Sequence, residues 1–279
     1  MRWRQFCKYC DSVGVYAISQ ISHETLKGYA DSWCKYLAVS TAQNYISSVN
    51  SVLKLINPNW ISCSPRNSIG RSRKFIRTQP LLFTADDIQS AAFELENMEC
   101  TDLSLLVQLA SEFGLRRREV ALLDIPNALK EARKLGDIDI QRGTKGGRGR
   151  SVDRWVPCGD QGIILLERAN YIIDGARCLV PTGESLKSFY DRISNICLPV
   201  LKRNGIGKLH NLRVFYACRR YREITGCVAP CNRVVGDLIA THELDEQARN
   251  IISIELGHSR VQIVSSYIGR KVRRSGSSE

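Results

Sequence analysis

Six side chains in the last two thirds of the chain could act together on one negatively charged group. In chain order they are Arg116, Lys145, His210, Arg213, His258 and Tyr267. Arginine and lysine offer N–H donors to an anion, and histidine transfers protons near neutral pH. If the fold brings the segments that carry them together, the sequence predicts a site for an anion.

The spacing of these residues supports a shared site. The stretch KLHNLRVFYACRR, residues 208–220, places His210 three residues before Arg213 on an apolar helix. Positions i and i+3 share one face of a helix, so the two side chains should point together. In FGLRRREV, Glu119 lies three residues after Arg116. We interpret Glu119 as a structural partner that orients an arginine.

The two candidate cations upstream also have structural interpretations. Arg116 follows a Gly-Leu pair and is the first of three consecutive arginines, all of which could lie on the surface. Lys145 lies in GTKGGRG, where it could be a solvated lysine at the tip of a hairpin. Arg148 and Arg150 are close enough in sequence to substitute for it.

The histidines and the tyrosine, taken singly, are compatible with structural roles as well. His210 could be a core histidine, and His258 could cap a helix. Tyr267 could pack in the core beside Ile263 and Val264. Tyr267 lies nine residues after His258, in LGHSRVQIVSSYIG.

The charge of the chain predicts a polyanionic partner. The net charge is +12 over 279 residues, and residues 1–80 carry 11 Lys and Arg against 3 Asp and Glu. A basic surface of this kind is typical of nucleic-acid-binding proteins. A flexible, solvated tether is the alternative interpretation of the basic segment at residues 61–80. The candidate DNA contacts are Arg66, Arg71, Arg73, Lys74, Arg77, Arg148 and Arg150.

Several other functions are not supported by the motifs. The 11 cysteines are an odd number without paired zinc spacings, which favours reduced thiols in a cytosolic protein. HELDE is not a zinc-hydrolase HExxH motif, and GTKGGRG lacks the ending of a nucleotide-binding P-loop. We therefore expect no metal and no cofactor. No apolar run is long enough to predict a transmembrane helix, and no signal peptide is expected.

Hydrophobic periodicity predicts two domains that are mainly α-helical. Residues 1–60 form a small helical domain, residues 61–80 form a basic linker rich in Pro, Ser and Gly, and residues 81–279 form the second domain. In the second domain, DIDIQ and SVDRWVPC alternate apolar and polar residues on either side of the glycine-rich segment. This pattern predicts a small antiparallel β-sheet among the helices.

Five motifs of the second domain, taken in chain order, resemble those of the tyrosine recombinases, also called phage-type integrases. They are an Arg in GLR-x-x-E, a Lys on a β-hairpin, H-x-x-R, LGH, and a Tyr about nine residues later. The resemblance implies a two-domain architecture, a helical SAM-like core-binding domain followed by an α+β catalytic domain. The 45 residues between Arg213 and His258 exceed the usual family spacing. This spacing is similar to that of a bacterial subgroup, the integrase domain-containing proteins, and implies an inserted excursion near residues 225–246.

The resemblance implies a role for each residue. Tyr267 is the expected nucleophile, His210 its base, and Lys145 the proton donor to the departing 5′ oxygen. Arg116, Arg213 and His258 are expected to bind the phosphate, because paired guanidinium N–H groups match its oxygens.

The implied activity is site-specific cleavage and rejoining of duplex DNA through a 3′-phosphotyrosyl link, without metal or ATP, in the service of a mobile genetic element. The implied partners are a double-stranded recombination site, further copies of the chain in a tetramer, and accessory DNA-bending proteins. The implied location is the bacterial cytoplasm, at the nucleoid. The alternatives are a type IB topoisomerase and a non-catalytic DNA-binding accessory protein.

Overall fold

The computed structural model describes residues 2–150 and 152–272, apart from the side chains of Arg148 and Arg150. It divides into two compact units, Met1–Lys74 and Phe75–Glu279. The predictions of DNA contact for Arg148 and Arg150 therefore lie outside the described side chains. Within the described ranges, no helix is long and apolar enough to cross a membrane.

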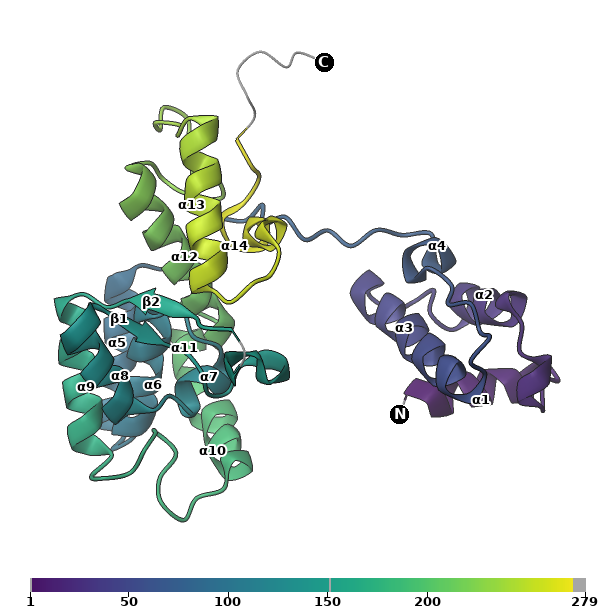
Figure 1. Ribbon diagram of the computed structural model, residues 1–279, viewed down its shortest axis with the longest axis horizontal. Helices are drawn as coiled ribbons and strands as arrows, with labels where there is room; N and C mark the ends of the chain where they lie inside the picture. Colours follow the sequence, from purple (N-terminus) through teal and green to yellow (C-terminus); the bar gives the residue numbers. More distant parts are fainter. Residues whose placement is uncertain (1, 151, 273–279) are drawn as a thin grey trace. The chain divides into compact units, whose positions relative to one another are not determined.

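The first unit is a bundle of short helices around its own core (Figure 1). Its helices are α1 (Arg2–Ser12), η1 (Ile18–Gln20), α2 (His23–Ser32), α3 (Val39–Ile56) and α4 (Pro65–Ile69). Ile46, Val49 and Leu53, spaced at three and four residues along α3, are buried, whereas Ile56 at the helix end is 45% exposed. The apolar stripe therefore reaches the core along the helix up to Leu53.

Part of the segment predicted as a linker is folded. Helix α4 begins at Pro65 after the N-cap Ser64, whose hydroxyl accepts from the backbone of Asn67, and it ends at Gly70 in a left-handed conformation. Ser, Pro and Gly favour loops by composition, but they are also the residues preferred at the start and end of a helix. In a helix of five residues these end positions dominate the sequence, so the helical pattern is hidden.

The second unit is mainly helical, as predicted. Its α-helices are α5 (Ala85–Asn97), α6 (Thr101–Glu112), α7 (Arg117–Ala121), α8 (Ile125–Leu135), α9 (Asp160–Ile172), α10 (Leu186–Arg192), α11 (Leu198–Arg203), α12 (Leu209–Thr225), α13 (His242–Glu255) and α14 (Ser265–Ile268). A π-helical turn, η3 (Ile193–Cys197), joins α10 to α11, and a 3-10 turn, η4 (Val261–Val264), precedes α14.

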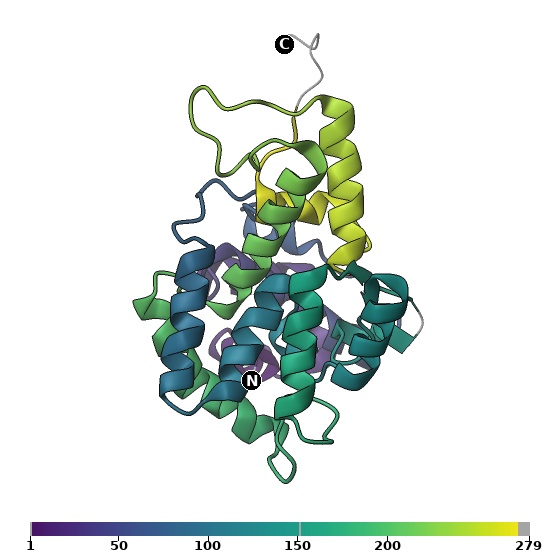
Figure 2. The same ribbon diagram turned by 90° about the vertical axis from the view of Figure 1, so that its left-hand side faces the viewer.

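Helix α6 lies at the centre of this unit. Every residue from Leu103 to Ser111 is buried, because α5, α9 and α12 pack around the helix (Figure 2). Helix α8 is absent from the sequence-based expectations. Its Pro126 lies in the first turn, where proline is tolerated, and Asp124 caps that turn.

The predicted small antiparallel sheet is confirmed. Strand β1 (Asp137–Asp139) pairs with β2 (Trp155–Pro157), with Ile138 opposite Val156. Both of these side chains are fully buried, so the alternation found in the sequence marks the face that packs on the core. The turn η2 (Lys145–Arg150) lies between the strands.

The extra segment between the H-x-x-R and LGH motifs is irregular from residue 227 to residue 240. It leaves α12 at the left-handed Gly226 and enters α13 after the N-cap Thr241. Within it, the backbone N–H of Cys231 donates to the carbonyl of Ile268 at 2.9 Å. The segment therefore packs against α14, the short helix that carries Tyr267.

Candidate active site

Arg116 lies at the amino end of α7, held there by Glu119. The backbone N–H of Arg116 donates to Glu119 Oε2 at 2.7 Å, and its Nη1 pairs with Oε1 at 2.5 Å. These two donations to the Glu119 carboxylate fix the arginine at the start of the helix. The Arg116 side chain remains 28% exposed, so an external anion could reach it.

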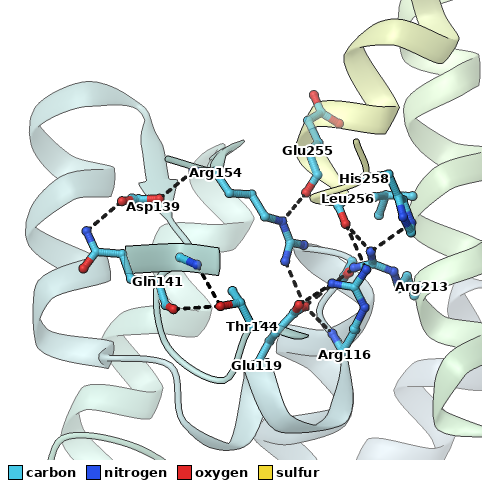
Figure 3. A network of polar contacts seen from close by, with 12 residues as sticks. Arg116, Glu119, Asp139, Gln141, Thr144, Arg154, Arg213, Glu255, Leu256 and His258 are labelled. Atoms are coloured by element: carbon cyan, nitrogen blue, oxygen red, sulfur yellow. Dashed lines mark hydrogen bonds and ion pairs between the residues drawn. The ribbon is translucent and has the colours of Figure 1, made fainter. Parts of the chain in front are cut away.

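Glu119 is the negative centre of a group of three arginines (Figure 3). Its fully buried carboxylate pairs with Arg116, with Arg154 at 2.9 Å and with Arg213 at 3.6 Å. Burial by itself would raise the pKa of Glu119, but the guanidiniums of Arg154, Arg213 and Arg116 outweigh it and lower this pKa to about 2. The prediction that Glu119 orients an arginine agrees with this geometry, and the group retains an excess of positive charge.

Arg213 is fully buried on α12. Its Nη1 donates to the carbonyl of Gly114, and its Nη2 donates to the carbonyl of Leu256. Gly114 has a φ of +60°, and a Cβ there would lie 2.5 Å from the ring of Tyr216. The Gly-Leu pair before Arg116 thus has a physical reason, because only glycine lets this carbonyl turn towards Arg213.

The carboxyl end of α13 is the second negative element of the site. The carbonyl of Glu255 accepts from Arg154 Nε at 2.7 Å, and the carbonyl of Leu256 accepts from Arg213 and, at 3.4 Å, from Arg116. The last carbonyls of a helix lack partners within the helix and carry partial negative charge. The three arginines therefore cap α13 while they gather around Glu119 (Figure 3).

Tyr267 and His258 meet at the same place. The Tyr267 hydroxyl lies 3.1 Å from His258 Nε2 and accepts from Arg213 Nε at 3.3 Å. Arg213 Nη2 lies 3.4 Å from the same His258 nitrogen. An arginine can only donate, so Nε2 must be the accepting nitrogen of a neutral imidazole. The Tyr267 O–H is then free to donate to it.

Electrostatics keep His258 in this neutral form. Burial, followed by the cationic side chains of Arg213, Arg116 and Arg154, lowers the pKa of His258 to about 3. At neutral pH the ring is therefore an acceptor, and its acceptor atom faces the phenol. The nitrogen within hydrogen-bond distance of the phenol thus belongs to His258, which the sequence predicts as a phosphate ligand, and not to His210, which it predicts as the base.

His210 approaches the same tyrosine from another side. Its ring centroid is 5.5 Å from that of Tyr267, and the ring planes are tilted by 50°. The residue is exposed and so is not a core histidine, but partial desolvation of the ring and the nearby Arg213 lower its pKa. The i and i+3 spacing therefore does bring His210 and Arg213 to one partner, but by a ring contact for His210 and by a hydrogen bond for Arg213.

Lys145 is the one predicted site residue that lies apart. It is exposed at the first position of η2, and among the described residues no contact joins it to the other five. The strands that flank it are nevertheless tied to the site. The backbone N–H of Arg154 donates to Asp139 Oδ1 at 2.8 Å, so this arginine belongs to the hairpin and to the arginine group at once.

The sequence motifs did not predict two buried arginines, Arg154 in this site and Arg249 beside α14. Arg154 is 4% exposed, and it fits against Gly257, where a Cβ would lie 2.9 Å from its Cδ. Arg249, which is 2% exposed, binds Asp245 and donates to the carbonyls of Gly269 and Arg270 at the end of α14. Both lie in segments without a recognisable motif, so only the contacts reveal them.

The arginines and lysine predicted to contact DNA differ in their surroundings. Arg71 donates to the carbonyls of Cys34, Lys35 and Leu37 at 3.3 Å, and the guanidinium of Arg73 binds the side chains of Gln43 and Asn44. Arg66 and Lys74 are exposed. The half-buried Arg77 donates through its backbone to Ser265 at 2.9 Å, next to α14. In the described part of the chain, no cluster of three His, Cys, Asp or Glu residues could hold a metal ion.

Comparison with known proteins identifies the fold of the chain. No family model and no curated protein sequence matches the chain. Among solved structures, the chain is similar to a lambda integrase dimer bound to a COC′ core site, with a TM-score of 0.55 and 16% identity over 99% of this chain and 73% of that one. It is also similar to the Tn1549 transposon integrase in complex with transposon right end DNA, with a TM-score of 0.58 and 13% identity over 97% and 89%. The chain therefore has the fold of the tyrosine recombinases, as its motifs predict.

Proposed function

We propose that the chain is a site-specific recombinase that cleaves and rejoins duplex DNA through a phosphotyrosyl link at Tyr267. One observation carries the proposal: the Tyr267 hydroxyl lies between Arg213 Nε and the acceptor nitrogen of His258. A phenol is a poor nucleophile until a base takes its proton and cations stabilise the charge that develops. The base, His258, and the cation, Arg213, both lie within hydrogen-bond distance of the Tyr267 oxygen.

In the proposed reaction, one phosphodiester bond of the DNA is exchanged for one phosphotyrosyl bond, so the number of phosphate ester bonds stays the same. The bound phosphate offsets the charge of the arginines that lowers the pKa of His258, so the ring becomes a stronger base. The Tyr267 oxygen then passes its proton to His258 and attacks the phosphorus, and the 5′ oxygen leaves with a proton from Lys145. The N–H donors of Arg116 and Arg213 stabilise the pentavalent transition state, and a single donor of this kind contributes about 3–4 kcal/mol. Because the phosphotyrosyl bond stores the energy of the broken bond, rejoining needs neither ATP nor, in this proposal, a metal.

The site has to open before it reacts. Tyr267 is 4% exposed and Arg213 is fully buried, whereas the Arg116 side chain is 28% exposed. A phosphate can therefore reach Arg116 first. Helix α14 then has to shift so that the tyrosine oxygen and Arg213 face the phosphorus, and the exposed hairpin has to bring in Lys145. Such gating would keep the nucleophile inactive away from DNA.

The proposal extends to the assembly. One structure of similar fold is a lambda integrase tetramer bound to a Holliday junction, with a TM-score of 0.55. We propose that this chain likewise acts as a tetramer on two DNA sites, with Met1–Lys74 as a DNA-binding unit and Phe75–Glu279 as the catalytic unit. A transposon integrase among the similar structures supports service to a mobile element.

Trapping on nicked suicide substrates tests the proposal. DNA flanking the gene is nicked so that the 5′ fragment escapes after cleavage, which leaves the covalent protein–DNA complex. We expect a complex with the unaltered chain and with Tyr171→Phe, an exposed tyrosine of the same unit, and none with Tyr267→Phe. Trapping by Tyr267→Phe at the level of the unaltered chain would refute the proposal. Exchange between two sites, rather than relaxation of supercoils alone, distinguishes a recombinase from a topoisomerase.

A further inference from the structure

We propose that Cys218 and Cys231 form a redox-sensitive dithiol site, which a hydroperoxide converts to a disulfide and which thereby displaces the helix carrying Tyr267. The two sulfur atoms are 3.9 Å apart, and their residues are only 8% and 9% exposed. Cys218 lies on α12, and Cys231 lies in the irregular segment that follows this helix. The site thus joins helix α12 to the segment that packs against α14.

Both thiols are bonded to the main chain of the nucleophile. Cys231 Sγ lies 3.5 Å from the carbonyl oxygen of Tyr267, and Cys218 Sγ lies 3.9 Å from the same oxygen. The backbone N–H of Cys231 also donates to the carbonyl of Ile268 at 2.9 Å. Any movement of the Cys231 sulfur or backbone is therefore transmitted to α14.

The two thiols differ in reactivity. A hydrogen bond from Cys218 lowers the pKa of Cys231 against the effect of burial, and the Arg77 guanidinium lowers it further. The same sulfur–sulfur hydrogen bond and burial raise the pKa of Cys218. A thiolate is the reactive form of cysteine, so Cys231 is the expected attacking residue and Cys218 the resolving residue.

The chemistry balances with a hydroperoxide as the oxidant. The Cys231 thiolate attacks one oxygen of hydrogen peroxide, the O–O bond breaks, and hydroxide leaves, which gives a sulfenic acid. The Cys218 sulfur loses its proton and attacks the Cys231 sulfur, and the hydroxyl group departs as water. Two thiols and one peroxide thus yield one disulfide and two waters. A dithiol reductant reverses the step.

The geometry requires movement when the bond forms. A disulfide holds its sulfur atoms about 2.05 Å apart, so the present 3.9 Å separation has to close by nearly half. The Cys231 S–H group, which lies 3.5 Å from the Tyr267 carbonyl oxygen, is consumed at the same time. Oxidation therefore removes a donor from the main chain of the nucleophile and pulls the segment that binds Ile268.

Peptide mapping and amide hydrogen exchange test the proposal on the full chain. Hydrogen peroxide is added to the unaltered protein, to Cys218→Ala and to Cys158→Ala, which removes a buried thiol elsewhere in the same unit. We expect a linked Cys218–Cys231 peptide, lighter by two hydrogens, in the unaltered protein and in Cys158→Ala only. Exchange in residues 265–269 should become at least severalfold faster on oxidation and return with dithiothreitol.

Two results would overturn the proposal. One is the absence of the linked peptide at peroxide doses that oxidise the partly exposed Cys7. The other is a linked peptide with unchanged exchange in residues 265–269, because the site would then not reach the nucleophile. Only the consequence for DNA cleavage, an expected loss of covalent trapping after oxidation, rests on the proposed function. The thiol and exchange measurements need no DNA, so failure of one proposal is distinguishable from failure of the other.

Discussion

The Nε atom of Arg213 donates a hydrogen bond to the hydroxyl of Tyr267 at 3.3 Å, although 54 positions separate the two residues in the chain. The arginine is fully buried, and its other N–H groups reach the carbonyls of Gly114 and Leu256. The position of its guanidinium is therefore set from three elements before any phosphate binds. In the proposed reaction, this preorganisation is what distinguishes a reactive tyrosine from a core tyrosine.

We predict that Arg213→Lys lowers the rate of covalent complex formation by about 100-fold or more, the usual loss for one oriented donor. A lysine is a point charge and cannot bind two carbonyls and the phenol at once. The variant should also be less stable to urea. Arg219→Lys, on the same helix but paired with Glu112, serves as the control and should retain most activity. Equal activity of the two variants would contradict this role of Arg213.

The buried carboxylate of Glu119 should govern stability in acid. Its pKa is about 2 in the folded protein, below its usual value of 4.5, so it stabilises the folded state above pH 4.5. This stabilisation, on the order of 3 kcal/mol, is lost as the pH falls from 4.5 towards 2. We expect Glu119→Gln to be less stable at pH 7 and to lack this part of the pH dependence. Urea unfolding between pH 2.5 and pH 7 measures both effects.

Arg154 should act through its charge as well as its contacts. Because its guanidinium helps to lower the pKa of His258, Arg154→Met should raise that pKa. Protonated His258 cannot accept the Tyr267 proton, so cleavage should fail at a higher pH than in the unaltered protein. We expect the ratio of cleavage rates at pH 4 and pH 7 to be lower in Arg154→Met than in the unaltered protein. Arg154→Lys, which keeps the charge, should preserve this ratio.

A merely structural Arg154 would lower the rate by the same factor at every pH. Arg133→Met is a matched control, because that guanidinium forms only a surface ion pair with Glu167. Its pH profile should coincide with that of the unaltered chain.

The exposed Lys145 should affect only the step in which the 5′ oxygen departs. We predict that Lys145→Ala cleaves ordinary DNA at least 10-fold more slowly, a typical loss for one proton donor. A substrate with sulfur in place of the bridging 5′ oxygen should restore the rate, since a thiolate leaves without a proton. The exposed Lys130→Ala should behave like the unaltered chain on both substrates. No rescue by sulfur would remove Lys145 from this role.

Local structure was largely predictable from the sequence. Helices begin at the N-caps Ser22 and Thr84, residue types typical of that position, and the alternation around residues 137–157 marks a real pair of strands. These features depend on backbone periodicity and on hydrogen bonds between near neighbours, which a short stretch of sequence contains. The irregular excursion between residues 227 and 240 was also predictable from the unusual spacing.

By itself the sequence determined which residue types are available to the site and which of them share a helix face, such as His210 and Arg213. The tertiary structure decided that His258 presents its acceptor nitrogen to Tyr267, that Arg154 joins the group around Glu119, and that Lys145 stays outside. The physical reason is the distance along the chain over which each effect acts. Helical periodicity acts over a few residues, whereas these partners come from different elements, and their meeting depends on how whole helices pack.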